Sequence, residues 1–236
     1  MEVKLLVGTP TQHGNVWAVY SNAMCNLEVK CASHGVRLTK GTVMGSCYIE
    51  DCRNKIADKF MNSDCTHLMF IDSDIGFDAD YVFHMLKFME TDSKYAIMGA
   101  NYPKKEIKWG AVVDAVKKGV PAEGLPYLAS ECTVEFPKVI APISQGQPMP
   151  VNKLATGFMM IRKSAFELFR KTYPERAFSN KSRFLYFNCG LLDGEWHGED
   201  YFFCKLMKDA GEQIWMCPWM DISHHGSHTF GKPVNA

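Results

Sequence analysis

The sequence predicts an α/β protein with a mostly parallel central sheet and helices on both of its faces. One observation behind this is that short apolar runs alternate with segments whose apolar residues recur at helical spacing. Another is the stretch HLMFIDSDIGF at residues 67–77, where a buried-strand pattern ends directly in two carboxylates, Asp72 and Asp74. Ligands of open α/β sheets bind beyond the carboxyl ends of the strands, so this pair marks a candidate site.

The first hundred residues carry the alternation most clearly. Apolar or β-branched runs at residues 3–9, 36–45, 67–71 and 95–101 predict strands. Residues 15–35, 48–64 and 78–91 have the periodicity of helices. Connections between such strands are right-handed, so this part resembles the topology of a nucleotide-binding half.

The rest of the chain is less regular. Proline and glycine are frequent between residues 104 and 150, which predicts loops and short strands there. Farther on, residues 153–163, 183–188 and 212–218 predict strands, and residues 164–174 and 197–211 predict helices. A length of 236 residues favours one domain, and we expect a single domain over residues 1–236.

The composition excludes several classes of protein. The chain has 26 basic and 26 acidic residues, which argues against non-specific nucleic-acid binding. No apolar run approaches the ~20 residues of a membrane helix, and the N-terminus lacks the pattern of a signal peptide. Nine cysteines without a CxxC pair favour free thiols in a reducing compartment. We therefore expect a cytoplasmic protein with no integral membrane segment.

The Asp-Ser-Asp sequence at residues 72–74 needs a positive partner, because two carboxylates held so close repel each other. A hard divalent cation such as Mg²⁺ or Mn²⁺ is one such partner, and it would leave positions free for phosphate oxygens. A solvated turn is the plain alternative. A calcium loop is excluded by its spacing, because counting from Asp72 puts Phe83 at position twelve, where a glutamate is required.

Two downstream stretches have chemistry that complements this pair. In HGEDYFF, Glu199 and Asp200 lie at a predicted helix start, where a carboxylate acts either as a cap or as a general base. In DISHHGSH, three histidines crowd together at His224, His225 and His228. This spacing suits a metal or phosphate role, and a zinc site with a nearby carboxylate is an alternative.

Taken together, these stretches resemble the nucleotide-sugar-dependent glycosyltransferases of the GT-A fold, which carry an Asp-x-Asp motif, and the match is family 2-like. The similar segments run through most of the chain; they are VGTPT, CRNKIADKFMNSDCTHLMFIDSDIGFDADYV, LATGFMMIRKSAF, HGEDYFFCKLMKDAG and ISHHG. The resemblance implies a nucleotide-sugar-binding half at residues 1–103 and an acceptor and catalytic half at residues 104–236. Residues 104–150 contain no motif of the family.

The resemblance also implies a role for each residue of the Asp-x-Asp region. Asp72 would contact the ribose or the metal, and Asp74 would be the firmer ligand of a Mn²⁺ or Mg²⁺ ion. His224 would be the late metal ligand, with His225 as the second choice. These assignments follow from the likeness of the motifs and not from their spacing.

Further positions would contact the substrates. Thr9 and Arg53 would bind the nucleotide, with a surface-helix arginine as the plain alternative for Arg53. Gly157 lies in the segment similar to the family's glycine-containing acceptor segment. Lys104 and Lys105 could contact the diphosphate or be a solvated charge pair.

The implied reaction moves a sugar from a nucleoside-diphosphate sugar to a hydroxyl of a glycan, a protein or another acceptor. Asp200 would be the base of an inverting mechanism, with Glu199 beside it, although a retaining outcome stays open. Trp196 and Phe158 would flank the acceptor cleft or belong to the core. Two other functions are a nucleotidyltransferase, disfavoured because the loop GTPTQHGN has too little glycine and no lysine or arginine, and a non-catalytic nucleotide-sugar-binding module.

Overall fold

The structure, a computed structural model, describes residues 2–139, 144–178 and 183–227. Its first hundred residues alternate strands and helices as predicted. The elements are β1 (Lys4–Thr11), α1 (Ala18–Ser33), β2 (Arg37–Met44), α2 (Ile49–Met61), β3 (His67–Ile71), β4 (Ile75–Gly76), α3 (Ala79–Thr91) and β5 (Ile97–Gly99).

The remaining elements are shorter. They are α4 (Trp109–Lys117), η1 (Ala122–Gly124), α5 (Leu125–Leu128), β6 (Val134–Glu135), β7 (Met149–Val151), β8 (Lys153–Leu154), β9 (Phe158–Arg162), α6 (Lys163–Thr172), η2 (Pro174–Arg176), β10 (Ala177–Phe178), β11 (Arg183–Phe184), β12 (Gly190–Leu192), β13 (Glu195–His197), α7 (Glu199–Asp209), β14 (Ile214–Met216) and β15 (Ser223–His224). No helix in the described part of the chain is both long and apolar enough to cross a membrane.

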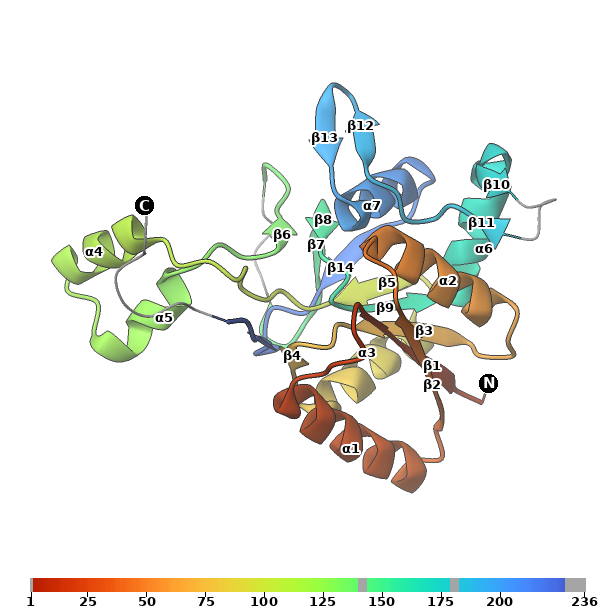
Figure 1. The fold of residues 1–236 in the computed structure, drawn as a ribbon, viewed down its shortest axis with the longest axis horizontal. Coiled ribbons are helices and arrows are strands. Elements are labelled where there is room, and N and C mark those ends of the chain that lie inside the picture. Colours follow the sequence, from red (N-terminus) through yellow and green to blue (C-terminus); the bar gives the residue numbers. More distant parts are fainter. Residues whose placement is uncertain (1, 140–143, 179–182, 228–236) are drawn as a thin grey trace.

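Helices α4 and α5 form an arm that projects from the body (Figure 1). The expectation of loops and short strands was wrong for these residues. Helix α4 has the sequence WGAVVDAVK and no capping side chain. Glycine and β-branched valine are poor helix formers, so the local helical signal is weak.

The central sheet has seven strands in the order β2-β1-β3-β9-β5-β14-β7. Strand β1 is parallel to β2 and β3, and β5 is parallel to β14. Strand β9 is antiparallel to both β3 and β5, and β7 is antiparallel to β14. Only β9 and β7 are therefore reversed, which confirms the mostly parallel sheet. Strands from both predicted halves of the chain take part in it.

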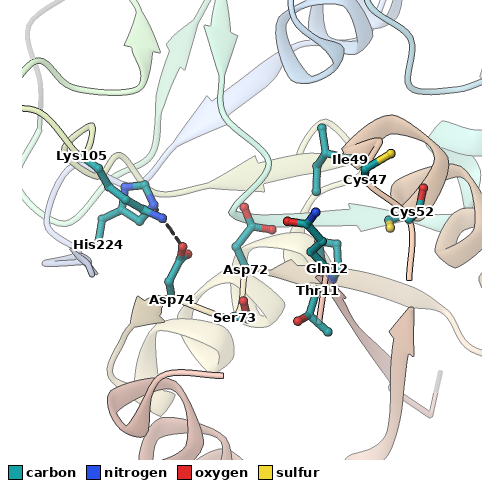
Figure 2. A pocket seen from close by; sticks show the side chains of 12 residues that line it. Thr11, Gln12, Cys47, Ile49, Cys52, Asp72, Ser73, Asp74, Lys105 and His224 are labelled. Carbon is teal, nitrogen blue, oxygen red and sulfur yellow. Dashed lines mark hydrogen bonds and ion pairs between the residues drawn. The ribbon is translucent and has the colours of Figure 1, made fainter. Parts of the chain in front are cut away.

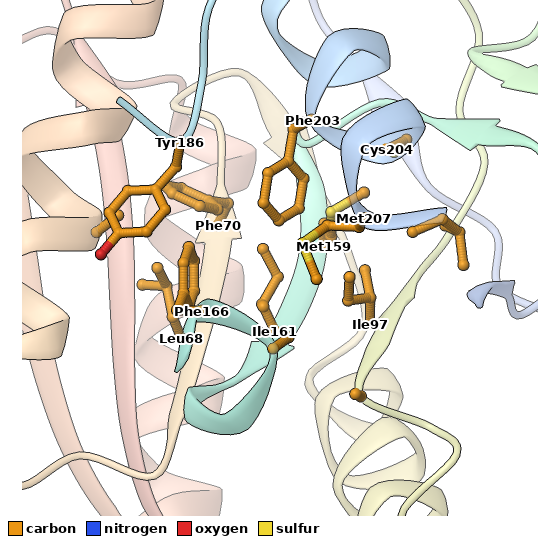
Figure 3. Packing of buried hydrophobic residues seen from close by; sticks show 14 of the residues in the cluster. Leu68, Phe70, Ile97, Met159, Ile161, Phe166, Tyr186, Phe203, Cys204 and Met207 are labelled. Carbon is orange, nitrogen blue, oxygen red and sulfur yellow. The ribbon is translucent and has the colours of Figure 1, made fainter. Parts of the chain in front are cut away.

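Helices cover both faces of this sheet, as predicted. In β3, Leu68 and Phe70 belong to the apolar cluster that α2, α6 and α7 share, whereas Met69 and Ile71 belong to the cluster of α1 and α3. This alternation follows from the two-residue period of a strand. Figure 3 shows the first cluster, with aromatic side chains packed between the sheet and the helices.

Candidate active site

A cavity of about 300 Å³ opens at the carboxyl edge of the parallel strands. The end of β1, the loop after β2, the start of α2, the loop after β3 and strand β15 all contribute to its wall. This is the position at which open α/β sheets bind ligands. Figure 2 shows the side chains that line it, which are those of Pro10, Thr11, Gln12, Ser46, Cys47, Ile49, Cys52, Asp72, Ser73, Asp74, Lys105 and His224.

A short antiparallel pairing between β4 and β15 brings His224 to the Asp-x-Asp loop. Ser223 pairs with Gly76, and a Cβ atom on Gly76 would lie 2.4 Å from the Ser223 hydroxyl, so any larger residue there would force the serine side chain to move. The backbone N–H of His225 donates to the Asp74 carbonyl at 2.8 Å. As a result, His224 Nε2 lies 3.6 Å from Asp74 Oδ1.

The protonation of His224 follows from its other nitrogen. Nδ1 lies 2.8 Å from the carbonyl oxygen of Pro103, and a carbonyl can only accept, so Nδ1 carries a proton. In neutral His224, Nε2 therefore presents a lone pair to the Asp74 carboxylate. Two electron-rich groups facing each other need a cation or a proton between them. This tautomer, fixed by a backbone carbonyl, is the usual one for a histidine that ligates a metal.

A lysine provides positive charge at this point in the structure. Lys105 Nζ donates to Asp74 Oδ2, the contact drawn as a dashed line in Figure 2. Burial raises the pKa of Asp74, but the hydrogen bond from Lys105 and the charge that His224 carries when protonated outweigh it, so the pKa is lowered. Lys104 instead pairs with Glu131 at 2.9 Å and does not line the cavity. Of the two lysines predicted to contact a diphosphate, Lys105 alone faces the site.

Asp74 and His224 suit a divalent cation as two of its ligands, one oxygen and one nitrogen. The described residues contain no group of three or more His, Cys, Asp or Glu side chains that could hold a metal. A metal at Asp74 and His224 would thus have to complete its shell with substrate oxygens and water. His225 instead lies 2.9 Å from Ser223 through its Nε2, and His228 lies outside the described residues.

Asp72 is bound differently from Asp74. Its two carboxylate oxygens accept hydrogen bonds from Arg53 Nη1 and Nη2, both at 3.0 Å. Arg53 also donates through Nε to Glu199 Oε1 at 3.0 Å. A metal at Asp72 would have to share that carboxylate with a buried arginine. Arg53 is only 3% exposed, so it is not a surface-helix arginine, and it is absent from the cavity wall.

Gly157 lets strand β9 approach this carboxylate closely. Its carbonyl accepts from the Asp72 backbone N–H at 3.0 Å, and its own N–H donates to the Tyr102 hydroxyl at 2.9 Å. A Cβ atom here would lie 2.2 Å from that hydroxyl and 2.9 Å from Asp72 Oδ2. Tyr102 also packs edge-on against His224, with ring centroids 5.1 Å apart. Sequence reasoning missed Tyr102, although it follows strand β5 at the same sheet edge.

Glu199 and Asp200 form the first turn of α7, as the sequence predicts. Burial and then the neighbouring charge of Glu199 raise the pKa of Asp200, while a hydrogen bond from the Tyr201 N–H opposes the rise. Tyr102 lies close enough to both Asp72 and Asp200 for their charges to raise its pKa further after burial has done so.

Three other predicted residues fall in different places. Thr9 is 3% exposed, its hydroxyl lies 2.6 Å from that of Tyr20, and Thr11 rather than Thr9 lines the cavity. Phe158 is fully buried, which places it in the core and not in a cleft. Trp196 is 70% exposed on strand β13 and is free to contact a ligand.

The chain matches no protein-family model, and no curated protein sequence matches it. Solved structures do match. A197 from STIV aligns over 95% of this chain and 86% of its own, with 14% identity and a TM-score of 0.53. GalNAc-T7 with UDP, GalNAc and Mn²⁺ aligns over 94% of this chain but 44% of its own, with 10% identity and a TM-score of 0.52.

A third match is the catalytic domain of Drosophila β1,4-galactosyltransferase 7 in complex with xylobiose. It aligns over 99% of this chain and 77% of its own, with 13% identity and a TM-score of 0.47. The match to GalNAc-T7, with a TM-score of 0.52, and the order of the central sheet show that the chain has the α/β fold of GT-A glycosyltransferases, as the sequence motifs predict.

Proposed function

We propose that this protein is a metal-dependent glycosyltransferase that moves a sugar from a nucleoside-diphosphate sugar to an acceptor hydroxyl. The observation that carries the proposal is the pairing of Asp74 with His224 at the mouth of the cavity, where His224 Nε2 and Asp74 Oδ1 lie 3.6 Å apart. The match to GalNAc-T7, solved with UDP and Mn²⁺, supports it at the level of the fold.

The cavity divides into two chemical regions. Asp74, His224 and Lys105 lie at one end, where a bound divalent metal and the lysine would together neutralise the diphosphate of the donor. Thr11 and Gln12 lie at the other end (Figure 2), where their hydroxyl and amide groups suit the nucleoside. Asp72 lies between these regions, in place to accept a hydrogen bond from the ribose.

Asp200 is the proposed base. A base works best when its pKa lies near the operating pH, and burial has moved that of Asp200 in this direction. It would take the proton from the acceptor hydroxyl as that oxygen bonds to the anomeric carbon. The bond from this carbon to the diphosphate oxygen breaks at the same time, and the nucleoside diphosphate leaves. Attack opposite the leaving group inverts the configuration.

Glu199 is less suited to this role because it is already engaged by Arg53. The acceptor could be a glycan, a protein or another hydroxyl compound. The exposed Trp196 offers an aromatic face on which a sugar ring could stack.

The test is a donor screen with purified protein. UDP-, GDP- and dTDP-sugars would be assayed for release of the nucleoside diphosphate, with Mn²⁺ or Mg²⁺ and with excess EDTA. We expect one nucleotide class to turn over only with metal, and Asp74→Asn and His224→Ala to raise the metal concentration needed. The control is Asp114→Asn, a surface carboxylate of α4 that pairs with Lys117. Full activity in EDTA would exclude the metal role.

The same screen addresses the non-catalytic alternative. A binding module would show a thermal shift with a nucleotide sugar but no turnover with any acceptor. It would also be indifferent to Asp200→Asn, which should slow an inverting enzyme by about 10²–10⁴-fold.

A further inference from the structure

We propose that Arg53 is a positioning residue that fixes the donor-side carboxylate Asp72 and the helix-start carboxylate Glu199 relative to each other. The inference rests on the proposed function, because it assigns Arg53 a part in aligning the two substrates. Arg53 itself would touch neither of them.

The geometry uses the whole guanidinium fork. Nη1 and Nη2 bind Asp72 bidentately, and Nε binds Glu199, with all three distances at 3.0 Å. The carboxylates come from the loop after β3 and from the first turn of α7, 127 positions apart by their numbers, 199 and 72. One rigid cation therefore binds two segments that are far apart in the sequence.

Stability alone does not account for this arrangement. Arg53 is the only lysine or arginine among the buried residues in the described part of the chain. Its guanidinium also lies 5.3 Å from the centroid of the Phe70 ring, in the core. Burying such a cation costs desolvation energy, and well-packed apolar residues are often as stabilising as a buried ion pair. The Arg53 guanidinium lies between the proposed donor site and the first turn of α7, so it can fix the position of Asp72 relative to Glu199.

The fork also separates the roles of the two neighbouring acids. Glu199 gives one oxygen to Arg53 and is held in place. Asp200, the next residue, makes no hydrogen bond with that guanidinium, and its Oδ1 accepts from the Tyr201 N–H at 2.7 Å instead. A lysine at position 53 would place one point charge there and could not serve both carboxylates with this geometry.

The test is a double-mutant cycle on kcat/KM for the donor, made with Asp72→Asn and Glu199→Gln. The structure records no hydrogen bond between these two side chains, and they communicate through Arg53. If Arg53 couples them, the double variant will be at least about 5-fold more active than the product of the two single effects predicts. Independent sites would agree with that product within about 2-fold.

A matched cycle controls for coupling through the bound substrates. Asp74→Asn replaces Asp72→Asn, because Asp74 belongs to the same donor site but pairs with Lys105 and His224 rather than Arg53. We expect this second cycle to be additive. Equal coupling in both cycles would overturn the proposal, as would additivity in the first.

Arg53→Lys completes the design. In this background the coupling between Asp72 and Glu199 should disappear, and kcat should fall by about 10²-fold, the effect of misplacing reacting groups by about 1 Å. The control is Arg183→Lys, which alters another arginine paired with an aspartate, Asp58, at 3.1 Å. Should Arg53→Lys fail to fold, the two cycles above decide the question without it.

Failure of the proposed function would look different. Wild-type protein and Arg53→Lys would then both show no transfer with any donor. The first cycle would in that case be measured on the free energy of unfolding, where additive effects of Asp72→Asn and Glu199→Gln would overturn the link.

Discussion

Replacing Asp200 with asparagine should make the protein more stable and less active at the same time. Burial and the charge of Glu199 raise the pKa of Asp200 to about 7. Its ionised form is therefore less favourable in the folded chain than in the unfolded chain, where the ordinary value of 3.8 applies. Asparagine keeps the shape and cannot ionise.

The sign and size of this stability change follow from the linkage between proton binding and folding. Well below pH 3.8 the carboxyl is protonated in both states and the variant gains nothing from the lost charge. As pH rises from about 4 to about 7, wild-type Asp200 loses stability, and above pH 7 the loss is complete. At about 1.4 kcal/mol for each pKa unit, the ceiling is about 4 kcal/mol. The helix dipole favours the charge at this end of α7 by about 0.3–1 kcal/mol, so we expect a net gain of roughly 1–3 kcal/mol.

The assay is urea unfolding of wild type and Asp200→Asn at pH 4.5 and pH 8, beside turnover at pH 8. The control, Asp209→Asn, changes an exposed carboxylate on the same helix that pairs with Lys205 at 2.9 Å. At pH 8 we expect Asp200→Asn, and not Asp209→Asn, to be more stable than wild type, and we expect the turnover of Asp200→Asn to be about 10²–10⁴-fold lower. In wild type, kcat/KM should fall as the pH drops through 7, because the proposed base Asp200 becomes protonated. A stability gain of Asp200→Asn over wild type that is no larger at pH 8 than at pH 4.5 would refute the argument.

Three further outcomes follow from the site. In Gly157→Ala the new Cβ would lie 2.2 Å from the Tyr102 hydroxyl and 2.9 Å from Asp72 Oδ2, so the variant should lose about 1–3 kcal/mol of stability and also turnover. The control Gly110→Ala places its Cβ in open space and should lower neither. Equal thermal midpoints for the two variants would contradict this. Lys105→Ala removes a cation that competes with metal, so half-maximal activity should need less Mn²⁺; an unchanged requirement would exclude that competition. Titration of the denatured, unreduced protein should recover nearly all nine thiols, and four disulfides would refute the expected reducing compartment.

Features written in consecutive residues were predictable from the sequence. Strand β3 and the two aspartates after it are one continuous stretch, and so are helix α7 and the acids that begin it. Their position at a sheet edge follows from the general rule for ligand sites in α/β folds. The direction of β9 was not predictable in the same way, because a buried strand such as FMMIR reads alike whether it is parallel or antiparallel.

Features that depend on distant pairing were beyond local patterns. Strands β4 and β15 have two residues each, and their pairing rests on the fit between Gly76 and Ser223, which are 147 positions apart. From its local pattern Arg53 is one more charged residue of an amphipathic helix, and only the folded chain brings Asp72 and Glu199 into contact with it. Tyr102 likewise looks like an ordinary core aromatic, and its hydroxyl gains a role only when Gly157 comes near it.

The two aspartates of the Asp-x-Asp sequence thus differ in how they are neutralised, and the difference has a chemical consequence. Asp72 is held by a buried arginine that cannot be deprotonated and cannot leave without opening the core. Asp74 is paired with Lys105, whose side chain is 40% exposed and can swing into solvent. Under the proposed function the site would take up a metal and a diphosphate and then release the product, and a fixed counter-charge beside an exchangeable one suits that cycle. The fixed one can preserve geometry through the cycle, and the exchangeable one can give way to the incoming cation at little cost.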